Sequence, residues 1–128
     1  MKSKAPKIQT VEIKKSFSIE SARFLPNLPS SHPCAHTHGH SFKITLRLQG
    51  AIDAKIGWLI DYNDITKTAA PVMKKIDHKL LNDVPGLKNP TTENITVWLF
   101  EKLKPMMPEL VQVIVQETSD TECSYPVL

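Results

Sequence analysis

Apolar and polar residues alternate along separate stretches of the chain, and this alternation predicts strands. Residues 8–20 alternate loosely, and residues 38–49 alternate more strictly up to Gly50. Because successive side chains of a strand point to opposite faces, such a stretch has one apolar face to bury. Residues 110–117 form a third strand of this kind, and we expect one more short strand near Tyr125.

Helical spacing replaces the alternation in the middle of the chain. Apolar residues recur three to four positions apart from Ile65 to Ile76, after a capping residue at Asp61 or Asn63. Pro71 lies inside this span, and we expect it to kink the helix or to mark a late first turn.

A second helix is expected to open near residues 91–93, where two hydroxyls and a carboxylate suit a helix N-terminus, and to end at prolines 105 and 108. The order of elements is then strand, strand, helix, helix, strand, with the extra strand last. This order predicts an α+β fold, an antiparallel four-stranded sheet with two helices on one face.

Length and composition narrow the class of protein. A chain of 128 residues with 41% apolar content suits one domain, which we place at 8–128 behind a basic, disordered lead-in at 1–7. The net charge is +3 with scattered lysines, so we expect no nucleic-acid partner. No run of about 18 apolar residues occurs, so we expect no membrane span. Two cysteines without signs of secretion indicate free thiols and a cytoplasmic protein.

Three histidines and a cysteine lie close together just before the second strand. His36, His38 and His40 would share a face if the strand extends back that far, and Cys34 has the same parity. Residues two apart lie about 7 Å apart along a strand, so two imidazoles could bind one metal ion. Imidazole commonly binds zinc. We therefore expect a metal or catalytic site here rather than core histidines.

A second group of polar residues lies at the ends of other predicted elements. Asp77 and His78 end the first helix, and Glu117 ends the third strand with the parity of Val113 and Val115. A carboxylate carried inward with those valines needs a partner, and the N–H edge of a ligand would provide one. With Cys34, these groups are the components of proton transfer on a bound substrate.

At least five separated motifs resemble, in order and spacing, the 6-pyruvoyl-tetrahydropterin synthase family. The motifs are His32-Pro33-Cys34 followed by His38-Gly39-His40-Ser41-Phe42, then residues 57–62, 77–83, 85–87, 89–93 and 117–118. The resemblance covers roughly residues 10 to 126. It is strongest to the branch that makes 6-carboxytetrahydropterin in queuosine biosynthesis.

The resemblance implies a tunnelling fold, in which subunits join their sheets into a β-barrel as trimers and two trimers stack into a hexamer. It also implies a lyase that converts 7,8-dihydroneopterin triphosphate to 6-carboxytetrahydropterin, with release of acetaldehyde and triphosphate. The expected partners are therefore a small pterin and further copies of the chain.

The resemblance also implies roles for individual residues. Cys34 would be the catalytic thiol, Asp77 and His78 the proton relay, and Glu117 the group that holds the pterin's amino-pyrimidinone edge. Thr91, Thr92 and Glu93 would contact or frame the pterin, and His38 and His40 match two of three zinc ligands. Zinc would act as a Lewis acid that eases enolisation of the substrate side chain.

The first metal ligand of the family departs from the pattern. Arg23 stands where that ligand, a histidine, is expected, and a guanidinium cannot bind zinc because it offers no lone pair. His36 or His32 could replace the ligand, Glu20 could swing in, or the site could be metal-free with Arg23 as its positive charge. We expect a retained zinc with a substituted ligand, preferably His36.

Arg23 also leaves alternative functions open. One is a related pterin enzyme of the same fold that acts on another pterin. The other is a non-catalytic module that binds a pterin or a metal, although such a module would not need Cys34, Asp77 and His78 together.

Overall fold

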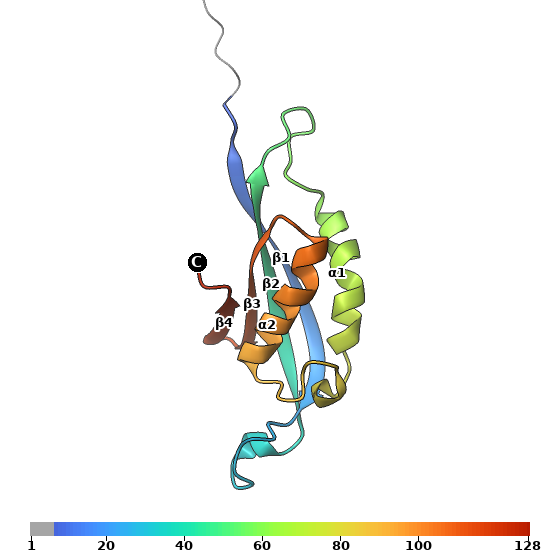
Figure 1. The fold of residues 1–128 in the computed structure, drawn as a ribbon, viewed down its shortest axis with the longest axis vertical. Helices are drawn as coiled ribbons and strands as arrows, with labels where there is room; N and C mark the ends of the chain where they lie inside the picture. Colours follow the sequence, from blue (N-terminus) through green and yellow to red (C-terminus); the bar gives the residue numbers. More distant parts are fainter. Residues whose placement is uncertain (1–6) are drawn as a thin grey trace, which may run out of the picture.

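The computed structural model describes residues 7–128 and arranges them as a four-stranded antiparallel sheet with both helices on one face (Figure 1). The strands, in their order across the sheet, are β1 (Thr10–Arg23), β2 (His38–Ala51), β3 (Leu110–Thr118) and β4 (Thr121–Tyr125). The helices are α1 (Tyr62–Ile76) and α2 (Thr92–Leu103). The predicted sheet is confirmed, including its short last strand. Of the expected disordered lead-in, residues 1–6 lie outside the described residues.

The helix boundaries follow the capping chemistry of the sequence. Asp61 caps α1, because its side chain accepts a hydrogen bond from the Asn63 N–H at 2.9 Å. Pro71 lies well inside α1, so the alternative of a late first turn is wrong. Thr91 caps α2 through a hydrogen bond from the Asn94 N–H at 3.1 Å. In residues 7–128, no helix is long and apolar enough to cross a membrane.

The core lies between the sheet and the two helices. Alternate side chains of β2 are almost fully buried, from Phe42 at 1% exposed to Leu48 at 0%. They pack with buried residues of both helices, among them Ile65 and Ile76 of α1 and Leu99 of α2. Burial of large aliphatic side chains at this density is the main stabilising contribution to a fold of this size.

The same alternation carries polar residues inward at one end of the sheet. On β1, Ser21 and Arg23 follow the buried Ile19 on the face that the helices cover. The pairing of β1 with β2 sets Arg23 opposite His38 and Ser21 opposite His40. At this end of the sheet, the inward-facing side chains are therefore polar rather than apolar.

Candidate active site

The site is built around Arg23, the last residue of β1. Its side chain is only 3% exposed. The guanidinium Nη2 lies 2.6 Å from Glu117 Oε1 of β3, and Nη1 donates to the carbonyl of Pro90 at 3.0 Å and to Thr92 Oγ1 at 3.3 Å. A buried guanidinium needs such partners because desolvation of an unpaired charge is costly.

Glu117 is held at both of its carboxylate oxygens. Its Oε1 takes the hydrogen bond from Arg23, and its Oε2 accepts one from Thr92 Oγ1 at 2.8 Å. Burial raises the pKa of Glu117, but the hydrogen bonds from Thr92 and Arg23 and the Arg23 charge outweigh burial, so the pKa lies below its ordinary value. The result is an ionised carboxylate, 25% exposed, near the end of β3 and beside the last residue of β1.

His38 and His40 lie together on β2, as their spacing predicts. Their ring centroids are 4.4 Å apart with the rings edge to face. His40 Nε2 lies 3.4 Å from Glu117 Oε1 yet is buried without a hydrogen-bond partner in the described residues, and the same holds for Arg23 Nε. Burial, followed by the charge of Arg23, lowers the pKa of His40 below its ordinary value. Both effects favour the neutral form of His40.

Asp77 and His78 form the pair that the sequence predicts. His78 Nδ1 lies 2.9 Å from Asp77 Oδ1, which also accepts a hydrogen bond from the Glu20 N–H at 3.0 Å. That backbone hydrogen bond is the main cause that lowers the pKa of Asp77. His78 has a positive φ of 56° and an imidazole that is 78% exposed. Its second ring nitrogen is thus free to exchange a proton with solvent or a ligand.

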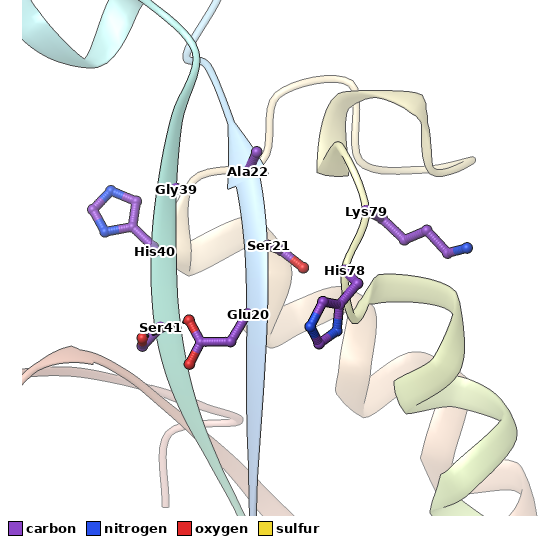
Figure 2. Close-up of a pocket in the computed structure, with 8 residues that line it drawn as sticks. All are labelled: Glu20, Ser21, Ala22, Gly39, His40, Ser41, His78 and Lys79. Atoms are coloured by element: carbon purple, nitrogen blue, oxygen red, sulfur yellow. Dashed lines mark hydrogen bonds between the residues drawn. The ribbon is translucent and has the colours of Figure 1, made fainter.

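A hollow of about 500 Å³ lies between His78 and the two long strands. Figure 2 shows Glu20 and Ser41 facing each other, His40 on the side of β2 away from β1, and His78 beside β1. Ser41 Oγ donates to Glu20 Oε2 at 2.6 Å, so Glu20 has its partner on the neighbouring strand. The chain segment of His78 is fixed here because its N–H donates to the Glu20 carbonyl at 2.6 Å.

Cys34 lies in the loop between β1 and β2, whereas Asp77 and His78 follow α1 and Glu117 lies near the end of β3. Cys34 lies in a short 3₁₀ turn (Pro33–Ala35) in the loop that projects past the end of the sheet in Figure 1. Its N–H donates to His32 Nδ1 at 3.0 Å. Within residues 7–128, no hydrogen bond or ion pair joins Cys34 to Asp77, His78 or Glu117.

A zinc ion needs at least three protein ligands here, and the structure offers two. His36 lies before β2 begins, and its Nε2 is hydrogen-bonded to the Ser30 carbonyl at 2.9 Å. His32 is engaged with the Cys34 N–H. Across the described part of the chain, no three His, Cys, Asp or Glu side chains are grouped to hold a metal. The residues present therefore do not complete a zinc centre, and the zinc ligand set remains a prediction.

The residues expected to frame a ligand occupy the start of α2. Thr91 is the helix cap, Thr92 binds Glu117, and Glu93 is exposed in the first turn. Thr92, Glu93 and Glu117 line a shallow hollow of about 340 Å³ together with Cys123 of β4. Our sequence interpretation did not single out Cys123, which reaches this hollow because β4 pairs it with Val115.

Comparison with known proteins identifies the family to which the chain belongs. A family model described as 6-pyruvoyl tetrahydropterin synthase matches residues 12–126. The 6-carboxy-5,6,7,8-tetrahydropterin synthase of Synechocystis sp. is 34% identical, over 88% of this chain and 91% of that protein. The dihydroneopterin monophosphate aldolase of Pyrococcus furiosus is 37% identical, over 56% and 59%. The structure of Caenorhabditis elegans 6-pyruvoyl tetrahydropterin synthase superposes with a TM-score of 0.84 at 24% identity, covering 94% and 98%.

Proposed function

Since the chain belongs to the 6-pyruvoyl tetrahydropterin synthase family, we propose that it is a lyase of the 6-carboxytetrahydropterin synthase type. Its substrate would be 7,8-dihydroneopterin triphosphate, and its products 6-carboxytetrahydropterin, acetaldehyde and triphosphate, as a step of queuosine biosynthesis in the cytoplasm. The observation that carries this proposal is the ionised carboxylate of Glu117, held by Thr92 at the inner end of the sheet.

Glu117 would hold the pterin through its amino-pyrimidinone edge. That edge presents two adjacent N–H donors, and an ionised carboxylate accepts such a pair in a fixed plane. Thr91, Thr92 and Glu93 would border the ring, because α2 begins beside Glu117. The ring would then be fixed while its side chain reacts, which is the main contribution that positioning makes to a rate.

Cys34, Asp77 and His78 would move the protons of the side chain. Asp77 fixes Nδ1 of His78, so that the other ring nitrogen exchanges the proton. The Cys34 thiol would transfer a second proton of the substrate side chain, the one that His78 does not move. Zinc, if a third ligand completes the site at His38 and His40, would supply Lewis acidity when bound, and no step here is assigned to it.

A second copy of the chain would complete the site. The Cys34 loop projects past the sheet, and both outer strands, β1 and β4, leave an open edge for strand pairing. Joining β1 of one copy to β4 of the next would close the sheets into a barrel, as a trimer or a stacked hexamer. This assembly would bring Cys34 and the Asp77–His78 pair of neighbouring copies to one substrate.

The test is to incubate purified protein with 7,8-dihydroneopterin triphosphate and to identify the pterin formed by mass and absorbance. We expect 6-carboxytetrahydropterin together with acetaldehyde, and no product from Cys34→Ala. Absence of any new pterin with the natural chain would contradict the proposed activity.

A second candidate function is cleavage of a different pterin of the same class. It is favoured by Arg23 in place of a metal ligand and by the similarity to the aldolase of Pyrococcus furiosus. The same assay with dihydroneopterin and its monophosphate separates the two candidates. Turnover of either of these compounds, with none of the triphosphate, would select the second.

A further inference from the structure

We propose that Arg23 is an internal ligand of Glu117. The Arg23 guanidinium occupies the place of the pterin edge until a pterin displaces it. The inference rests on the proposed function, because it takes Glu117 to be the group that holds the pterin. It assigns to Arg23 control over the affinity of the site for its substrate.

The chemical likeness between the two ligands is close. The amino-pyrimidinone edge of a pterin is a cyclic guanidine, and it offers a carboxylate two N–H donors in one plane. The guanidinium of an arginine offers the same planar pattern with a full positive charge. In the structure, Arg23 Nη2 lies 2.6 Å from Glu117 Oε1, the atom that the pterin would need.

The guanidinium also contacts Thr92, one of the residues expected to border the pterin. Its Nη1 donates to Thr92 Oγ1 at 3.3 Å, in the first turn of α2, and to the Pro90 carbonyl at 3.0 Å, just before the helix. Its central carbon lies 5.2 Å from the centre of the Phe42 ring. A flat, donor-bearing group therefore already fills the space between Phe42, Glu117 and α2.

Two buried nitrogens at the site have no protein partner among the described residues. Arg23 Nε and His40 Nε2 have no hydrogen-bond partner in residues 7–128, although the Arg23 side chain is only 3% exposed. Buried polar atoms in folded proteins normally have a hydrogen-bond partner, and a bound group is one way to supply it. His40 Nε2 lies 3.4 Å from Glu117 Oε1, and a pterin ring on that carboxylate has acceptors and donors along its edges that could serve as its partner.

The same contacts account for the missing metal ligand. Arg23 holds the position of the family's first zinc ligand, has no lone pair to offer, and places a positive charge close to His40. A cation is disfavoured there as long as Arg23 stays on Glu117. One substitution thus changes both the metal-binding and the pterin-binding parts of the site.

The experiment is titration calorimetry of 7,8-dihydroneopterin into the natural chain and into Arg23→Met, which keeps much of the side-chain volume and removes every donor. We expect Arg23→Met to bind at least about tenfold more tightly. Arg47→Met is the matched control, because Arg47 forms an ion pair of the same 2.6 Å length with Glu12 elsewhere on the sheet. Its affinity should equal that of the natural chain.

A second variant keeps the test decisive if Arg23→Met does not fold. Arg23→Lys retains the charge but has one nitrogen in place of the planar fork, so we expect it to bind dihydroneopterin several-fold more tightly than the natural chain. Thermal melting of all four proteins verifies folding.

The possible outcomes test the role of Arg23 separately from the proposed function. Unchanged or weaker binding by folded Arg23 variants, with binding by the natural chain, would overturn the inference and leave the proposed function standing. Failure of the natural chain and of both folded variants to bind dihydroneopterin would overturn the pterin site itself, and the inference with it.

Discussion

Arg23 and Glu117 form an ion pair with a nitrogen–oxygen distance of 2.6 Å across the end of the sheet, although 94 positions separate them in the sequence. Arg23 is 3% exposed and Glu117 is 25% exposed, so the pair lies at the boundary between the core and solvent. A buried charge that loses its partner destabilises a protein far more than the intact pair stabilises it. The pair therefore links the stability of the fold to the chemistry of the site.

The first prediction concerns this pair. Glu117→Ala leaves the Arg23 charge buried without its carboxylate, and we expect the free energy of unfolding to fall by about 3 kcal/mol. The double variant Arg23→Met with Glu117→Met removes both charges, and it should recover most of that loss. Urea unfolding of the three proteins measures both effects. A double variant no more stable than Glu117→Ala would show that the pair is not the cause.

The second prediction concerns His78, whose φ of 56° is in the left-handed region. In this conformation the Cβ atom of a side chain clashes with the backbone, which is destabilising, whereas glycine has no Cβ. We expect His78→Gly to be about 1 kcal/mol more stable than His78→Ala in urea unfolding. Both variants should lose pterin turnover, because each lacks the imidazole. Equal stability of the two variants would contradict the backbone assignment.

The third prediction is a pH dependence that arises from Asp77. The pKa of Asp77 is lowered in the fold from its ordinary value of 3.8, chiefly by the Glu20 N–H. A lowered carboxyl pKa gives stability that is complete above pH 3.8 and is lost as the pH falls through the folded-state value. We expect Asp77→Asn to be less stable than the natural chain at pH 7, by about 0.5 kcal/mol after solvent screening.

Thermal melting between pH 2.5 and 7 measures the Asp77 contribution. The difference between the natural chain and Asp77→Asn should shrink as the pH falls below 3.8. A difference that stays constant across this range would show that Asp77 is not ionised by its contacts with Glu20 and His78.

The fourth prediction concerns metal content. His38 and His40 lie together, and His36 is hydrogen-bonded to the Ser30 carbonyl. The resemblance to the family places Arg23 where the first zinc ligand is expected. We expect elemental analysis of untagged natural protein to find no stoichiometric zinc, and Arg23→His to hold about one zinc per chain. About one zinc per natural chain would mean that another residue completes the site, as the sequence led us to expect.

Much of the fold could be predicted from local pattern. The alternation on either side of Phe42 places the inward face of β2, and Asp61 and Thr91 mark the starts of both helices through their capping hydrogen bonds. These features depend on residues close together in the sequence, so a single sequence contains the signal for them.

The contacts among the predicted site residues could be predicted only in part. The sequence indicated Glu117, Thr92 and the Asp77–His78 pair, yet it gave no reason to join Arg23 to Glu117, because that contact depends on strand register. Inward parity of both residues at one end of the sheet was the available signal. The position of Cys34 depends on how a long loop folds, and local pattern does not determine that.

The measurement that tests the central claim most directly is a crystal structure of the protein with 7,8-dihydroneopterin bound. We expect the amino-pyrimidinone edge of the pterin on Glu117 and the Arg23 guanidinium moved off that carboxylate. A pterin bound elsewhere, with Arg23 still 2.6 Å from Glu117 as in the free chain, would contradict the assignment of both residues.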